Sequence, residues 1–118
     1  MRVESILDLV GNTPVIGIHT LSPNKNIKIY LKLEGQNPGG YIKDRAAVSM
    51  IEAAEKSGEL KAGGTVLESS SGNTAIGLAL VCKLKGSHLV IVLSENVTTE
   101  RKELLKSYGA EIIYSDGS

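Results

Sequence analysis

The sequence predicts an α/β fold in which a short parallel sheet carries helices on both faces, preceded by an N-terminal segment of a different kind. Helical and strand-like segments alternate from residue 43 onward. Residues 89–93 form a continuous apolar run, which is typical of a buried strand in a parallel sheet. The 118 residues contain no Phe and no Trp, so one aliphatic core is expected.

The first third of the chain has the weaker pattern. Residues 6–10 predict a short amphipathic turn or helix, which Gly-Asn-Thr-Pro at residues 11–14 interrupts. Apolar and polar residues alternate over residues 27–34, which predicts a strand with one solvated face. Asn-Pro-Gly-Gly at residues 37–40 predicts a turn.

A helix is predicted over residues 43–56, and Gly58 is its expected stop. The apolar residues of this helix are expected on one side: Ala46, Ala47, Met50, Ile51 and Ala54. Residues 65–68 are β-branched or apolar for the most part and predict a strand. The polar run at residues 69–73 predicts a loop between this strand and the next helix.

The second half of the predicted sheet continues the alternation. Residues 74–85 predict a helix that is apolar nearly all round and therefore deeply packed. The apolar strand at residues 89–93 follows. Thr98 or Thr99 can cap a third helix, and residues 111–114 predict a last short strand. Strands that alternate with helices in this way form a parallel sheet through right-handed crossovers.

Charge and composition argue against several classes of function. Lys plus Arg and Asp plus Glu both total 13, so the formal net charge is zero. Nucleic-acid binding and electrostatic membrane attachment both require a basic excess, so neither partner is expected. No Cys/His set has metal-ligand spacing, so no metal is expected. Cys82 is the single cysteine, and the sequence has neither a signal-peptide pattern nor a membrane span, so a cytoplasmic location is expected.

The loop before the first helix places a lysine at the helix start. Its sequence is Asn-Pro-Gly-Gly-Tyr-Ile-Lys-Asp-Arg, residues 37–45. The partial positive charge of a helix N-terminus disfavours a cation there, so the Lys43 amine loses its proton more easily. A neutral amine is what Schiff-base chemistry requires. The alternative interpretation is a solvated charge cluster of Lys43, Asp44 and Arg45 at a helix start.

A second polar loop, residues 69–74, lies between a predicted strand and a helix N-terminus. Ligands of parallel sheets bind beyond the carboxyl ends of strands, and helix N-termini attract carboxylate or phosphate. Gly72 permits close approach of the backbone to a ligand, and Asn73 offers a donor and an acceptor. The alternative is an ordinary connection with a Ser or Asn cap. A P-loop is excluded because Leu78 and Ala79 stand where Lys and Ser or Thr are required.

The two loops together are specific. Asn-Pro-Gly-Gly-x-x-Lys-Asp-Arg followed by Ser-Gly-Asn-Thr at residues 71–74 resembles the fold type II family of pyridoxal-phosphate (PLP) enzymes. Cysteine synthases and cystathionine β-synthases are the most similar branches, and residues 43–51 look most like a B-type cysteine synthase. Further matching segments are residues 10–14, 31–35, 100–101 and 108–112.

This resemblance implies roles for the polar residues of both loops. Lys43 would hold PLP covalently and later act as the base that removes the Cα proton of the substrate. Asn73 would hydrogen-bond the ring hydroxyl of the cofactor. The α-carboxylate of the amino-acid substrate would be bound by Ser70, Ser71, Gly72 and Thr74. The implied reaction is a β-replacement in which sulfide displaces acetate from O-acetylserine and L-cysteine forms.

The resemblance also implies how the chain is divided. Residues 1–35 would belong to the large domain, and residues 36–118 would form the small α/β domain, truncated at its C-terminus. The Gly/Thr-rich loop that binds the PLP phosphate in the family would lie beyond residue 118. We therefore expect an N-terminal fragment that is inactive alone and binds PLP weakly or not at all. The unpaired strand edge near residues 27–34 is a candidate for dimer formation or strand exchange, so a homodimer is expected.

Three residues depart from the family pattern, and two alternatives stay open. Tyr41 stands where Ser is usual, and Ser70 and Ala75 replace Thr and Gly, although Ser70 keeps a hydroxyl for the carboxylate. The alternatives are another fold type II enzyme, of the cystathionine β-synthase or diaminopropionate synthase type, and a non-catalytic α/β interaction domain. Cys82 lies in the apolar helix and is interpreted as a buried structural thiol.

Overall fold

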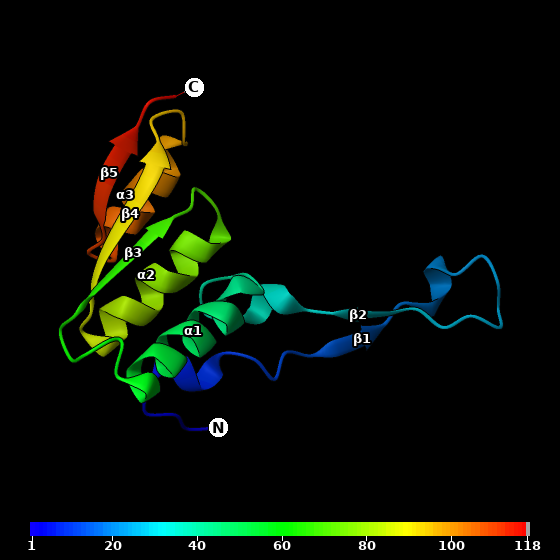
Figure 1. Ribbon diagram of the computed structural model, residues 1–118. Helices are drawn as coiled ribbons and strands as arrows, with labels where there is room; N and C mark the ends of the chain where they lie inside the picture. Colours follow the sequence, from blue (N-terminus) through cyan, green and yellow to red (C-terminus); the bar gives the residue numbers. More distant parts are fainter. Residues whose placement is uncertain (118) are drawn as a thin grey trace.

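A three-stranded parallel sheet and three α-helices form the body of the computed structural model, which describes residues 1–117 (Figure 1). The strands lie side by side in the order in which the chain forms them: β3 (Thr65–Ser69), β4 (His88–Ser94) and β5 (Glu111–Ser115). The helices are α1 (Lys43–Ser57), α2 (Asn73–Lys85) and α3 (Thr99–Ser107). The predicted α/β fold with a short parallel sheet is confirmed, and the helix bounds agree with the sequence pattern to within two residues.

Helices α2 and α3 cover one face of the sheet. Leu89, Ile91 and Leu93 of β4 point into the core on that face, and α2 contacts β3, β4 and α3. The opposite face is open over residues 1–117, because Leu67 is 68% exposed and Ile113 is 48% exposed. The sequence predicts helices on both faces, whereas α1 packs chiefly against α2 in the described part of the chain.

Helix α2 is the centre of the core, as its apolar sequence predicts. Every residue from Ala75 to Cys82 is buried. Helix α1 lies against it with a narrower apolar stripe than expected: Ala47 and Ile51 are buried, but Met50 is 46% exposed. The stripe is narrow because α1 has a single helix as its main neighbour.

The closest approach between α1 and α2 occurs at Gly77. A Cβ atom at this position would lie 3.1 Å from the backbone oxygen of Lys43 and 3.2 Å from the Cβ atom of Ala47. Glycine therefore lets the second turn of α2 touch the first turn of α1 directly. The contact places the starts of the two helices at the same end of the body (Figure 1).

A two-stranded antiparallel arm extends away from the body (Figure 1). It consists of β1 (Val15–Gly17) and β2 (Tyr30–Lys32), and all six residues are exposed. The predicted strand over residues 27–34 is therefore shorter than expected and solvated on both faces. Within residues 1–117, its apolar side chains have one short neighbouring strand and no helix to cover them.

Three short 3-10 helices complete the described elements: η1 (Ile6–Leu9), η2 (His19–Leu21) and η3 (Glu34–Gln36). The helix predicted near residues 6–10 is confirmed, and Ser5 caps it by accepting from the Leu7 backbone N–H at 3.1 Å. Across residues 1–117, the helices are all too short or too polar to span a bilayer.

Candidate active site

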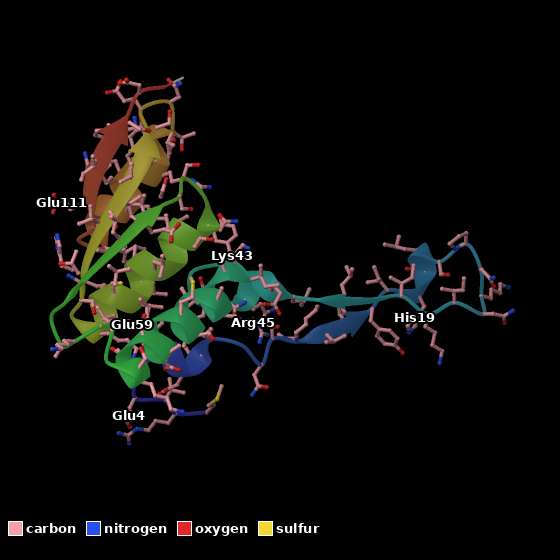
Figure 2. All side chains as sticks on the ribbon, in the orientation of Figure 1. Glu4, His19, Lys43, Arg45, Glu59 and Glu111 are labelled. Atoms are coloured by element: carbon pink, nitrogen blue, oxygen red, sulfur yellow. The ribbon has the colours of Figure 1, made fainter. Side chains whose placement is uncertain are left out.

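The structure brings the two predicted loops to one edge of the body. Lys43 is the first residue of α1 and Asn73 is the first residue of α2. The contact of Gly77 with the Lys43 backbone sets these two helix starts side by side. Figure 2 shows Lys43 at the N-terminal end of α1, close to the loop that leads into α2. The carboxyl ends of β3 and β4 lie at the same edge, where parallel sheets bind their ligands.

The Lys43 side chain is exposed to solvent. Within residues 1–117 its amine takes part in no hydrogen bond or ion pair. The residue before it, Ile42, offers no side-chain cap to the helix. The amine is therefore accessible to a carbonyl compound and is not committed to a structural partner.

The two residues after Lys43 have partners in the fold: Asp44 is buried, and Arg45, whose side chain is 38% exposed, is paired with Glu34. Asp44 is 1% exposed, and its Oδ2 atom accepts a hydrogen bond from the Gly39 backbone N–H. Burial raises the pKa of the Asp44 carboxyl, and the hydrogen bond from Gly39 opposes that rise. Arg45 donates two hydrogen bonds to Glu34, at 2.8 Å and 3.0 Å. The interpretation of residues 43–45 as a solvated charge cluster is wrong for Asp44, which is buried, whereas Arg45 is partly exposed and ion-paired with Glu34.

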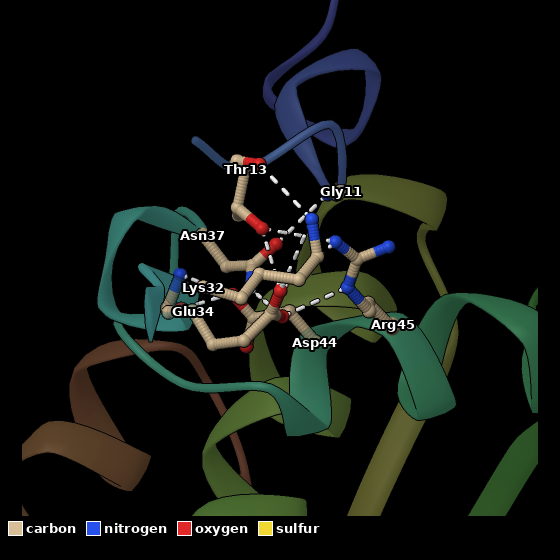
Figure 3. A network of polar contacts seen from close by, with 8 residues as sticks. Gly11, Thr13, Lys32, Glu34, Asn37, Asp44 and Arg45 are labelled. Atoms are coloured by element: carbon tan, nitrogen blue, oxygen red, sulfur yellow. Dashed lines mark hydrogen bonds and ion pairs between the residues drawn. The ribbon is translucent and has the colours of Figure 1, made fainter. Parts of the chain in front are cut away.

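Glu34 is the centre of a polar network that joins three segments (Figure 3). Thr13 donates its hydroxyl to Glu34 at 2.5 Å and accepts from Arg45 at 3.1 Å. Asn37 donates to Glu34 at 2.9 Å and accepts from the Gly11 N–H at 2.8 Å. The hydrogen bonds from Arg45 and Thr13 lower the pKa of Glu34 from 4.5 to about 2.

No function was predicted for this network from the sequence, although its segments lie in the motifs named above. The network connects residues 11–13 and residues 34–37 to the first turn of α1. Glu34 and Arg45 flank the Gly-rich loop in the sequence. This pair of opposite charges is the signal that would have indicated the network. The consequence is that the loop before Lys43 is fixed at the end where it leaves the arm.

The second loop presents free backbone donors. Gly72 precedes α2 with an extended backbone, φ −106° and ψ −159°, and no side chain caps this helix. The alternative of an ordinary Ser or Asn cap is therefore wrong. The Ser70 hydroxyl accepts from the Gly72 N–H at 3.2 Å, which leaves the N–H groups of the first turn of α2 for an anion. A Cβ at Gly72 would meet only Ser70 Oγ, at 4.0 Å, so the fold itself does not require glycine here.

Helix α3 also contacts the second loop, at residues 69–74. Arg101 donates a hydrogen bond to the backbone oxygen of Ser71 at 3.0 Å. Ser71 is exposed, whereas Asn73 and Thr74 are half-buried. A hollow of about 190 Å³ lies beside Arg101, between the loop before Lys43, the first turn of α2 and α3. Its lining residues are Tyr41, Ile76, Thr98, Glu100, Arg101 and Leu104.

Two other features do not belong to this edge. A hollow of about 280 Å³ near the C-terminal half of α1 contains none of the predicted site residues. Cys82 is 1% exposed, and burial raises the pKa of its thiol to about 11. The interpretation of Cys82 as a buried structural thiol is confirmed.

The edge combines two complementary chemical functions. The accessible Lys43 amine can bond to an aldehyde carbon. The uncapped N-terminus of α2 and the neighbouring Ser and Thr hydroxyls can bind an anion. A small molecule with both a carbonyl group and an anionic group fits this arrangement.

Comparison with known proteins gives a consistent result. Residues 6–118 match the family described as "Pyridoxal-phosphate dependent enzyme". A cysteine synthase from Staphylococcus aureus is 47% identical over 116 residues, which are 98% of this chain and 37% of that protein. A hydrogen sulfide-producing enzyme from Fusobacterium nucleatum superposes with a TM-score of 0.94 at 43% identity, over 100% of this chain and 39% of that chain.

An O-acetylserine dependent cystathionine β-synthase from Helicobacter pylori has a TM-score of 0.89 at 34% identity. That superposition covers 98% of this chain and 39% of that chain. The 118 residues thus span 37% of the length of the cysteine synthase that they match.

Proposed function

Because this chain belongs to the pyridoxal-phosphate dependent enzyme family, we propose that its 118 residues are the N-terminal part of a cysteine synthase with Lys43 as the PLP-binding lysine. One observation carries the proposal. An uncommitted, exposed lysine amine and an uncapped helix N-terminus lie at the same edge of a parallel sheet. PLP has an aldehyde for the first group and is anionic, so the residues present fit it.

The proposed mechanism assigns a task to each group at this edge. Lys43 would hold PLP covalently through its amine, and the same amine would take the proton from the substrate Cα atom. PLP, when bound, supplies the electron sink that makes this proton acidic. The Asn73 amide donates a hydrogen bond to the ring hydroxyl oxygen. The substrate carboxylate is bound by hydroxyl and N–H groups of Ser70, Ser71, Gly72 and Thr74.

The reaction we propose is the replacement of the acetate of O-acetylserine by sulfide, which yields L-cysteine. The similarity to the S. aureus cysteine synthase supports this choice, at 47% identity. We further propose that residues 1–35 belong to a large domain and residues 36–118 to a small one. The exposed apolar strands of the arm support this division, because a larger sheet would cover them. A homodimer and a cytoplasmic location complete the proposal.

Two other functions have specific support. The similarity to the H. pylori enzyme supports a cystathionine β-synthase, another fold type II activity. The open sheet face, with Leu67 68% exposed, supports a non-catalytic interaction domain for the 118 residues alone. Assays of the full-length protein separate the two enzymes: sulfide with O-acetylserine gives cysteine, whereas homocysteine with O-acetylserine gives cystathionine. Faster turnover of homocysteine would favour the second activity.

The test of Lys43 uses the chain as it stands. The protein is mixed with excess PLP and reduced with borohydride, and the modified lysines are identified by peptide mass spectrometry. We expect weak reversible binding but a predominant adduct on Lys43, which Lys43→Arg abolishes. Lys56→Arg, which alters an exposed lysine at the other end of α1, is the matched control and should leave the adduct unchanged. Labelling spread evenly over the surface lysines would contradict the proposed role.

A further inference from the structure

Asp44 is a buried carboxylate whose burial needs an explanation. It follows Lys43 directly and is 1% exposed. Its Oδ2 atom accepts one hydrogen bond, from the Gly39 N–H, and its Oδ1 atom has no partner within residues 1–117. Burying a carboxylate with so few partners is unfavourable, so an apolar side chain would pack here at lower cost. The single contact that the carboxylate makes is therefore the feature to explain.

The Asp44 carboxylate lies tightly against the backbone of Gly39. Figure 3 shows Asp44 beside the network of Glu34. A Cβ atom built on Gly39 would collide with both carboxylate oxygens of Asp44. The backbone of Gly39 is not left-handed, so its conformation alone does not require glycine. Glycine is needed at this position because the carboxylate approaches the backbone so closely.

The loop before Lys43 is thus held at two points. At its start, Glu34 binds Arg45 and Asn37. In its middle, the Gly39 N–H binds Asp44. Both holding side chains, Asp44 and Arg45, come from the helical turn that Lys43 begins. The backbone that carries the Lys43 side chain is therefore held by the contacts of Asp44 and Arg45.

We infer that Asp44 is a positioning residue: its carboxylate holds the turn of residues 38–40 on the first turn of α1 and so fixes the backbone from which Lys43 enters the site. The inference rests on the proposed role of Lys43. Asp44 is 1% exposed, so its carboxylate is not accessible to a ligand from solvent. It acts through the Gly39 N–H and the chain that joins Gly39 to Lys43.

Amide hydrogen exchange at Gly39, followed by NMR on the full chain, measures this contact directly. Asp44→Ala removes the acceptor, and exchange should become about tenfold faster. Asp44→Asn keeps an acceptor oxygen, so exchange should stay within about threefold of the wild-type rate. Glu52→Ala, which removes an exposed carboxylate from the same helix, is the control and should leave the rate unchanged. An unchanged Gly39 rate in Asp44→Ala would overturn the inference.

Labelling with PLP and borohydride then tests the link to the lysine. The ratio of Lys43 to Lys56 adducts in one sample should fall several-fold in Asp44→Ala and recover in Asp44→Asn. Faster exchange without a change in this ratio refutes the positioning of Lys43. Equal labelling of Lys43 and Lys56 in the wild-type chain refutes the proposed function, while the exchange rate still decides whether Asp44 holds the turn.

Gly39→Ala gives a second test, and its exchange and labelling measurements are made on a chain that keeps Asp44. The added methyl group displaces the carboxylate, so the residue 39 amide should exchange faster and Lys43 labelling should fall. The methyl should cost less stability in the Asp44→Ala background, where its collision partner is absent. The inference would be refuted by a wild-type exchange rate at residue 39 in Gly39→Ala. It would also be refuted if the methyl group lowered the free energy of unfolding equally with Asp44 and with Ala at position 44.

Discussion

The contact between α1 and α2 at Gly77 is sensitive to a single methyl group. In Gly77→Ala the new Cβ atom would lie 3.1 Å from the Lys43 backbone oxygen, 3.2 Å from the Ala47 Cβ atom and 3.3 Å from the Lys43 carbonyl carbon. All three are tighter than ordinary van der Waals contact. None belongs to the end of a flexible side chain, so the strain is relieved only if one helix moves away from the other.

Two opposing terms set the size of the effect. Alanine in a helix interior is more stable than glycine by about 1 kcal/mol. Overpacking a well-filled interface costs about 1–3 kcal/mol. Because the clashing atoms are backbone and a Cβ atom, we place the cost in the upper part of that range. The net expectation is destabilisation by about 1–2 kcal/mol.

Urea unfolding measures this difference. For a small domain the free energy of unfolding changes by about 1–3 kcal/mol per molar urea, so at a slope of about 2 kcal/mol per molar the midpoint should fall by about 0.5–1 M. Gly35→Ala is the matched control, because a Cβ atom there would meet only the Gly40 backbone oxygen, at 3.9 Å. It should leave the midpoint unchanged or raise it slightly. A midpoint for Gly77→Ala at or above the wild-type value would refute the reasoning that the two helices are in contact at this glycine.

Two further predictions concern titratable groups. Glu34 has a folded-state pKa of about 2, below its ordinary value of 4.5. The ionised Glu34 therefore stabilises the fold fully above about pH 4.5, and this stabilisation is lost as the pH falls towards 2. Glu34→Gln should therefore lose less stability than the wild type between about pH 5 and pH 2, as urea midpoints across that range would show; an equal loss would contradict the assignment. Cys82, with a pKa raised to about 11, should react with iodoacetamide at about pH 8 at least tenfold more slowly in the native chain than in urea. Equal rates would mean that the thiol is accessible.

The helices and the parallel strands were predictable because their signals are local. The eight buried residues of α2 form an unbroken apolar run in the sequence, and Gly58 and Gly86 adopt the left-handed conformation of helix C-caps. The arm was harder to predict. An alternating pattern identifies a strand, but it does not reveal whether neighbouring elements cover that strand. Exposure of both faces of β2 follows from the absence of such elements among residues 1–117.

The candidate site was predictable in its residues and not in its connections. The motifs identified Lys43 and the loop at residues 69–74, and the structure places them at one edge. Charged residues are expected at the surface, so nothing local indicated the burial of Asp44. The partners of Glu34 lie 21 and 11 residues away, at Thr13 and Arg45. Such contacts depend on the folded chain. The chemical roles of Lys43 and Asn73 stay predictions.

The arm also changes how the molecule moves through solvent. The Cα radius of gyration is 17.3 Å, with principal extents of 52 × 39 × 24 Å. A compact chain of this length has a radius of gyration of about 13–14 Å. A single chain would therefore elute from a gel-filtration column as a larger, rounder protein and could be mistaken for a pair. Light scattering reports mass independently of shape, so it is the measurement that can count the subunits of the proposed homodimer.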